Sequence, residues 1–216
     1  MKKSYAESRR KFENAKRIWR LEEDWLTPCE YIPYISALFD YEIDLDPCST
    51  EHANKEFLRA RNFYTKEDDG LNIDISWSGK VYCFPPTYGR CSFNKQRGSW
   101  RWGLHGGTGS TSPSVAWFRR LEREWKLRNV FEGLLFSCNH ELFRVCPEMW
   151  NYPVCIPTKR ANLIQGKKYY TFKTPFTWGF FIYLPQPSIG FQSSEKFREI
   201  FSHIGHIINY ALFEKL

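Results

Sequence analysis

Short apolar runs alternate with charged segments of helical period along most of this chain. The runs combine β-branched and aromatic residues and end at a proline or a polar cluster, as strands do. We therefore expect strands at 41–50, 80–84, 130–138, 152–157 and 177–185, the first of them breaking at Pro47.

Segments with helical character lie between these runs. Residues 28–39 predict a short helix, 51–64 a helical or irregular piece, and 114–129 a charged helix. The C-terminal segment predicts a helix that has Ser194 as its N-cap and an apolar stripe facing the core. The stripe consists of Phe197, Ile200, Phe201, Ile204, Ile207, Ile208, Ala211 and Leu212. Strands that alternate with helices predict an α/β sheet.

The length of 216 residues fits one domain, and 42% hydrophobic residues are enough for its core. We expect a basic helical extension at 1–21 and the domain itself at 22–216. Residues 90–114 interleave basic and aromatic residues before a tract of Gly, Ser and Thr. This composition predicts an inserted loop.

Net charge and cysteine content limit the kinds of binding partner and metal site that we expect. The net charge of +7 favours an anionic partner, with nucleic acid first and an anionic membrane surface second, although a basic solvated face would look the same. No apolar run is long enough to span a bilayer. The seven cysteines include no CxxC pair, and we expect reduced thiols in an intracellular protein without a metal site.

Two of the expected strands end in a proline turn, in "DLDPC" and in "CFPPTYG". If these strands are parallel neighbours, Asp46 and the second turn face one crevice, where open α/β sheets bind ligands. Proline carbonyls beside an aromatic ring suit a flat group that carries an amino function, such as a nucleobase. A rigid loop with a packed tyrosine is the alternative interpretation.

Three elements occur in a fixed order: "DWLTP" at 24–28, "DLDPCS" at 44–49 and "EDDGLNIDISWSGKVYCFPPTYGR" at 67–90. Together they resemble the phage-type DNA N6-adenine methyltransferase family, in which D-E-W-x-T-P, D-L-D-P-C-A and D-D-G-L…W-x-G…N-P-P-Y succeed one another. The later segment "CNHELFRVCPEMWNYPVCIPTKRANLI" is also similar, so the resemblance covers roughly residues 22–185.

The resemblance implies a Rossmann-like methyltransferase fold, with a mostly parallel central sheet flanked by helices. It also implies S-adenosylmethionine as cofactor and transfer of a methyl group to the N6 amino group of adenine in DNA. The cofactor-binding residues carried over are Thr27, Pro28, Asp46, Pro47, Cys48 and Asp69. The Asp46 carboxylate would bind the cofactor's ammonium group. Asp68–Gly70 could equally be a solvated acidic turn, and we expect Trp77 and Gly79 to serve packing.

The candidate catalytic residues carried over are Phe84, Pro85, Pro86 and Tyr88. In the family the first residue is polar and accepts a hydrogen bond from the adenine amino group, a proline carbonyl accepts another, and the fourth residue stacks on the base. Here Phe84 has no acceptor, and Thr87 takes the stacking position. By analogy, the missing acceptor alone would cost about 10²–10³ in rate. A catalytically inactive protein that binds nucleic acid is therefore the alternative to an active enzyme.

Two basic segments are candidates for nucleic-acid contact. The residues are Arg90, Lys95, Arg97, Trp100 and Arg101 in the first, and Lys159 and Arg160 in the second. Basic residues that alternate with rings suit phosphate contact combined with base stacking. Double-stranded, adenine-containing DNA is the expected partner, RNA stays an alternative, and a solvated loop would need no partner.

Overall fold

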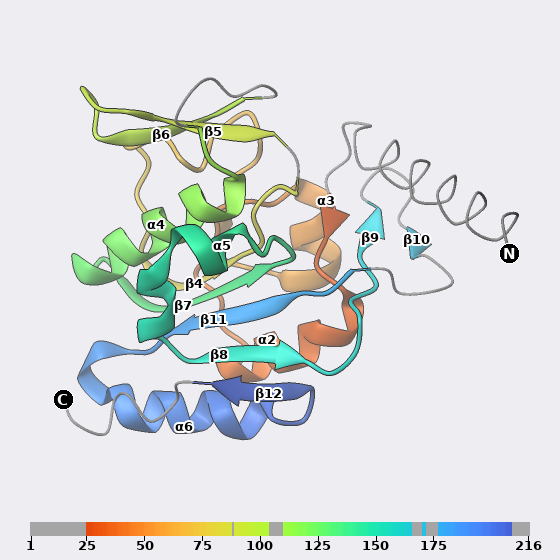
Figure 1. The fold of residues 1–216 in the computed structure, drawn as a ribbon. Coiled ribbons are helices and arrows are strands. Elements are labelled where there is room, and N and C mark those ends of the chain that lie inside the picture. Colours follow the sequence, from red (N-terminus) through yellow and green to blue (C-terminus); the bar gives the residue numbers. More distant parts are fainter. Residues whose placement is uncertain (1–24, 88, 104–109, 166–169, 172–176, 209–216) are drawn as a thin grey trace, which may run out of the picture.

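A seven-stranded sheet runs through the centre of the computed structural model, which describes residues 25–87, 89–103, 110–165, 170–171 and 177–208 (Figure 1). In spatial order its strands are β12 (Gly205–Ile208), β8 (Val154–Pro157), β11 (Phe180–Leu184), β7 (Val130–Ser137), β4 (Gly79–Cys83), β2 (Leu45–Asp46) and β3 (Asn62–Phe63). From β3 to β7 all neighbours are parallel. β11 is antiparallel to both β7 and β8, and β12 is antiparallel to β8. Five of the seven described strands therefore share one direction, which confirms a mostly parallel α/β sheet.

Helices cover both faces of this sheet (Figure 1). One face carries α2 (Ile32–Leu38), which follows the 3-10 turn η1 (Cys29–Tyr31), and α6 (Gly190–Phe201), which follows η4 (Pro187–Ile189). The other face carries α4 (Pro113–Lys126), α5 (Glu141–Val145) and η3 (Pro147–Asn151). The short α3 (Glu51–Ala53) and the π-helical η2 (Asn54–Leu58) connect β2 to β3.

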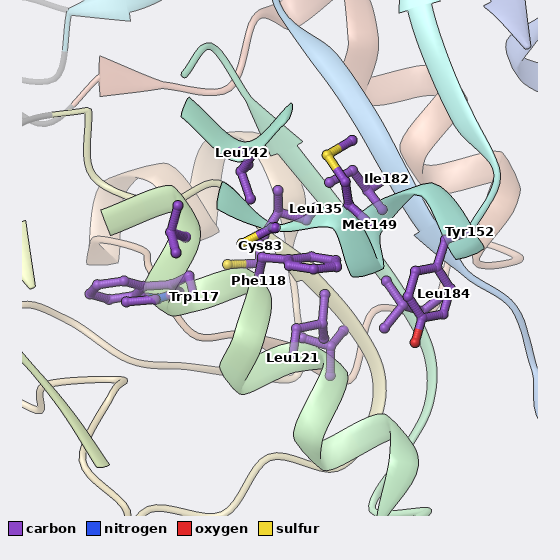
Figure 2. Close-up of a cluster of buried hydrophobic side chains, with 14 of the residues drawn as sticks. Cys83, Trp117, Phe118, Leu121, Leu135, Leu142, Met149, Tyr152, Ile182 and Leu184 are labelled. Carbon is purple, nitrogen blue, oxygen red and sulfur yellow. The ribbon is translucent and has the colours of Figure 1, made fainter. Parts of the chain in front are cut away.

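Alternate residues of each strand point into one of two cores, because side chains along a strand face opposite sides of the sheet. Val81 and Cys83 of β4 and Leu135 of β7 face α4. Figure 2 shows this cluster, in which Phe118 and Leu121 of α4 point toward the strands. The intervening residues, such as Tyr82 and Leu134, pack against α2 and α6 instead. Two buried faces explain why the central strands read as continuous apolar runs.

The expected loop at 90–114 is wrong for its first part, which forms an antiparallel hairpin. β5 (Arg90–Asn94) pairs with β6 (Ser99–Gly103), and Cys91 also bridges to Thr111. Residues paired across the two strands, such as Cys91 and Trp102, lie on the same face of the hairpin, and the next pair along lies on the opposite face. The turn uses Gly98 at φ +64°, a conformation that glycine adopts without strain. Residues 104–109 lie outside the described residues.

The expected helix from Ser194 onward is also wrong in its bounds. The helix begins at Gly190 and ends at Phe201, so Ser194 lies inside it and donates to the Gly190 carbonyl at 2.7 Å. Gly205–Ile208 is the edge strand β12, paired with β8. Ile207 and Ile208 fit the spacing of apolar residues in a helix as well as in a strand, and β-branched residues favour the strand. The strand is also favoured by Gly205, whose backbone packs against that of Ile156 so closely that a Cβ would have no room. Ala211 and Leu212 lie outside the described residues.

The other expected elements are confirmed to within a few residues. These are the helices at 28–39 and 114–129 and the strands at 80–84, 130–138, 152–157 and 177–185. Within 41–50 the strand is only Leu45–Asp46, and the helical piece expected at 51–64 ends at Leu58 and is followed by the strand β3. The extension at 1–21 lies outside the described residues. Within the described part of the chain, no helix has both the length and the apolarity to cross a bilayer. The same part contains no cluster of three metal-ligating side chains.

Candidate active site

The two proline turns meet at one edge of the sheet. β2 and β4 are parallel neighbours, with Leu45 opposite Val81. Because parallel strands end at the same edge, the turn Asp46–Cys48 that follows β2 lies next to the turn Phe84–Pro86 that follows β4. This adjacency is what the arrangement of the two motifs in the sequence leads us to expect.

A pocket opens where these turns meet. Its volume is about 660 Å3 when the solvent-filled mouth is included. Aromatic, hydroxyl and charged side chains share its wall. The lining residues are Trp25, Leu26, Pro47, Cys48, Ser49, Thr50, Thr65, Lys66, Asp69, Gly70, Phe84, Pro86, Trp102 and Trp117. We call this the cofactor pocket.

A third turn, Asp68–Gly70, closes the cofactor pocket beside Pro47. A Cβ at position 70 would collide with the carbonyl oxygen of Pro47, so only glycine permits this backbone contact. Trp77 is 1% exposed and donates its indole N–H to the Gly70 carbonyl at 3.0 Å. The expected packing role of Trp77 is confirmed. Asp69 lines the pocket, whereas Asp68 is exposed and bonds Thr65.

Asp46 lies behind the pocket wall. Its side chain is 3% exposed, and Oδ1 accepts a hydrogen bond from the Cys48 amide at 3.1 Å. Burial raises its pKa to about 6, although hydrogen bonds from the Cys48 amide and the Ser49 side chain partly offset this effect. Asp46 thus shapes the turn that presents Pro47 and Cys48 to the pocket.

Cys48 connects the two strand ends. Its Sγ lies 3.5 Å from the Sγ of Cys83, the last residue of β4. Burial raises the pKa of Cys83, so this thiol is protonated at neutral pH. The contact holds the turn after β2 against the end of β4, and Cys48 lines the pocket.

Thr27 and Pro28 are buried near this region. The Thr27 hydroxyl lies 2.8 Å from the Tyr82 hydroxyl. The two preceding residues form β1 (Trp25–Leu26), which pairs with β9 (Ile164–Gln165). It is these two residues of the segment that line the pocket. The third strand of this small sheet is β10 (Tyr170–Thr171).

The diproline turn separates the cofactor pocket from a second pocket. Phe84 lines both, Pro86 lines the first, and Pro85 lines the second. Phe84 is 6% exposed, and its ring centroid is 5.0 Å from that of Phe136, so it also belongs to the core. Tyr88 lies outside the described residues.

The second pocket has mostly polar walls. Its volume is about 710 Å3 including the open mouth. The lining residues are Phe84, Pro85, Thr87, Ser114, Cys138, Asn139, His140 and Glu141. The Thr87 hydroxyl oxygen is buried and has no hydrogen-bond partner in the described structure. We call this the amine pocket, after the expectation from the sequence that the turn Phe84–Pro86 holds an amino group.

The hairpin separates its basic residues from its rings. Lys95 and Arg97 lie at the exposed tip, and Arg101 is exposed on one face. Trp100 is half-buried on the other face, where its ring packs on Phe93 at 5.0 Å. Arg90 is engaged internally by the Ser110 carbonyl at 2.7 Å and by Glu141 at 3.4 Å. Phosphates can therefore reach Lys95, Arg97 and Arg101 more easily than Arg90.

The second basic segment follows β8. Lys159 and Arg160 are exposed, and the Arg160 guanidinium stacks on the Trp178 ring at 5.6 Å. Trp178 is 44% exposed, so this pair presents a flat cationic surface to solvent. It comes from a different segment than the hairpin tip.

Several pocket residues are ones that sequence reasoning missed. Trp117 on α4 is 4% exposed, lines the cofactor pocket, and has an indole N–H without a partner in the described structure. Lys66 lies over the Trp102 ring at 5.1 Å, and both line the same pocket. In the sequence, a tryptophan on the apolar face of a helix looks like any core residue, so only the fold shows that Trp117 lines a pocket.

Comparison with known proteins finds one similarity, and it covers these turns. No curated protein and no solved structure matches the chain significantly. The family model described as DNA N-6-adenine-methyltransferase (Dam) matches residues 15–102, a range that contains all three turns of the cofactor pocket. Residues 15–102 are therefore similar to the DNA N-6-adenine-methyltransferase (Dam) family, over less than half of the chain.

Proposed function

We propose that this protein transfers a methyl group from S-adenosylmethionine to the N6 amino group of adenine in DNA. One observation carries the proposal: the turns after β2 and β4, both within the family match, line one pocket. In this proposal the sheet is a Rossmann-like methyltransferase fold. Its ligands would bind beyond the carboxyl ends of the parallel strands.

The residues of the cofactor pocket fit S-adenosylmethionine. Trp25 and Trp117 offer aromatic surface for a flat ring, and the unpartnered indole N–H of Trp117 offers a donor. Asp69 in the wall and Asp46 behind it supply negative charge for an ammonium group. When bound, the cofactor would supply a methyl group on a positively charged sulfur.

The chain's own contribution is to hold the amino group toward this pocket. The Pro85 carbonyl is the acceptor that the family resemblance assigns, and Pro85 lines the amine pocket. Rigid prolines keep such a carbonyl in place without a backbone N–H of their own. Positioning of this kind lowers the entropic part of the barrier.

Substitution of Gly70 by alanine tests the pocket. The new Cβ must push the Asp68–Gly70 turn away from the Pro47 carbonyl, and overpacking of this kind costs about 1–3 kcal/mol. We expect S-adenosylmethionine affinity, measured by calorimetry, to fall by roughly tenfold. Transfer of labelled methyl to adenine-containing DNA, followed by detection of N6-methyladenine in a digest, should fall with it.

Gly133→Ala is the matched control, because it adds the same methyl group against the Leu121 side chain at 3.1 Å, and neither residue lines the cofactor pocket. This variant should bind the cofactor as the parent does. Cofactor binding by the parent without transfer to any DNA would favour the inactive nucleic-acid-binding protein, for which Phe84 is the supporting observation. Absence of cofactor binding by the parent would overturn the proposal.

The hairpin tip is the proposed DNA contact. Arg97 pairs with Asp74 at 3.5 Å, but both side chains are exposed, so a phosphate can replace this weak ion pair. We expect Arg97→Ala combined with Arg101→Ala to weaken DNA binding. Each lost phosphate contact should reduce the slope of log K against log salt by about 0.9, which fluorescence anisotropy across a salt titration measures.

The matched control combines Arg61→Ala with Lys126→Ala. Both residues have exposed side chains that form ion pairs, and they precede β3 and β7, at the opposite edge of the sheet from the cofactor pocket. Their loss should leave the salt slope close to that of the parent protein. An equal effect of the two double variants would remove the hairpin from the DNA interface.

A further inference from the structure

The amine pocket contains hydrogen-bonding groups that the family motif does not supply. Phe84 forms part of its wall and of the cofactor pocket, so the two pockets adjoin at one side chain. Asn139 and Glu141 line the amine pocket but not the cofactor pocket. The buried Thr87 hydroxyl, without a partner in the described structure, lines the same pocket. A buried hydroxyl of this kind favours a ligand that bonds it.

Asn139 is fixed by its neighbours. Its backbone N–H donates to the Ser137 hydroxyl at 3.0 Å, and that hydroxyl lies 3.0 Å from the Ser114 hydroxyl. Its side-chain oxygen accepts a hydrogen bond from the Glu141 amide at 2.9 Å. An amide oxygen has two lone pairs, so one is left for a ligand, and the side-chain NH₂ adds a donor.

Glu141 is also held in place. Its carboxylate lies 3.4 Å from the Arg90 guanidinium, which is itself anchored on the Ser110 carbonyl at 2.7 Å. The Glu141 side chain is 21% exposed, so it is partly shielded from water. The remaining lone pairs of the carboxylate make it an acceptor directed by a fixed ion pair.

Resting on the proposed function, we propose that the amine pocket binds a planar heterocycle with an exocyclic amino group, and that Asn139 and Glu141 supply the acceptor that Phe84 lacks. An adenine edge presents an amino donor beside a ring-nitrogen acceptor. A carboxamide matches both groups at once. Asn139 and Glu141 are thus substrate-positioning residues from the turn after β7, in place of one at the end of β4.

A binding comparison tests this inference without catalysis. The ligands are deoxyadenosine and purine deoxyriboside, which differ only in the amino group, added to the full chain with S-adenosylhomocysteine and followed by ligand-observed NMR. The parent should prefer deoxyadenosine by about tenfold. Asn139→Ala combined with Glu141→Gln should reduce this preference to near unity. The control Asn151→Ala with Glu199→Gln changes exposed residues of the same types and should keep it.

A second variant guards against loss of the local fold. Asn139→Asp retains an oxygen for the Glu141 amide and for a ligand amino group, so it should keep the preference that Asn139→Ala reduces. Equal ligand selectivity in the parent and in the double variant would overturn the inference, as would no selectivity in the parent. Methyl transfer by the double variant with unchanged KM and kcat would overturn it while leaving the proposed function intact. Absence of transfer by the parent, together with a preference for deoxyadenosine that only the double variant loses, would overturn the proposed function and leave this inference intact.

Discussion

Replacement of Asp46 by asparagine is expected to stabilise the fold above pH 6 and, at the same time, to weaken S-adenosylmethionine binding. Burial raises the pKa of Asp46 to about 6, against about 3.9 in an unfolded chain. The folded state therefore holds its proton more tightly than the unfolded state. The stability that Asp46 contributes is complete below about pH 4 and is lost as the pH rises through 6.

The loss amounts to about 3 kcal/mol, since two pKa units correspond to roughly that difference. Asparagine does not titrate, and its side-chain oxygen can still accept from the Cys48 amide. Urea unfolding at pH 4 and pH 8 should show a variant that gains stability over the parent only at the higher pH. An equal difference in unfolding free energy between variant and parent at both pH values would contradict the raised pKa of Asp46. The control is Glu199→Gln, which changes an exposed carboxylate.

Cofactor binding should change in the opposite direction. At pH 8 the buried carboxylate is ionised, and it can interact with an ammonium group through the pocket wall. Because the carboxylate acts through the wall and not by direct contact, we expect loss of its charge to cost on the order of 1 kcal/mol, or roughly fivefold in affinity. Calorimetry of the more stable variant would thus separate the two roles. Unchanged affinity would confine Asp46 to shaping the turn.

Substitution of Phe84 by asparagine is expected to destabilise the protein without raising methyl transfer. The family motif alone suggests the reverse, since it would restore an acceptor worth about 10²–10³ in rate. In the structure, however, Phe84 is 6% exposed and packs on Phe136. Replacement of a core phenylalanine by a small residue costs roughly 3–5 kcal/mol, and an unbonded amide adds to this cost.

Denaturant unfolding and single-turnover transfer at low temperature, where the variant stays folded, measure the two effects. Phe84→Leu keeps an apolar side chain and should retain most of the stability and the parent rate. A rise in rate of about a hundredfold in Phe84→Asn would mean that no other residue supplies the acceptor. Such a result would contradict the role that we propose for Asn139 and Glu141.

Local patterns predicted the parts of the site that lie at strand ends. Asp46 and Pro85 each follow a short apolar run, and prolines mark where those runs stop. Because parallel neighbours end at one edge, their meeting could be inferred before any coordinates. The two-residue length of β2 shows that such a motif does not require a long strand.

Other parts depend on tertiary contacts that no local pattern encodes. Trp117 lies at a helix position that reads as core, and Asn139 follows a strand without a motif. The hairpin at 90–103 contains glycine and many charged residues, which are typical of a loop, so its sequence did not indicate the pairing of β5 with β6. The strand β12 was not predicted, because Ile207 and Ile208 fit the apolar stripe of a helix as well as a strand.

The contact between Gly70 and the Pro47 backbone has a consequence for how this chain tolerates change. Two turns more than twenty positions apart are joined as one rigid clamp, so their spacing in the pocket does not depend on the length of the segment between them. A side chain introduced at position 70 would therefore displace both turns at once, and we expect glycine to persist there in natural variants of this protein.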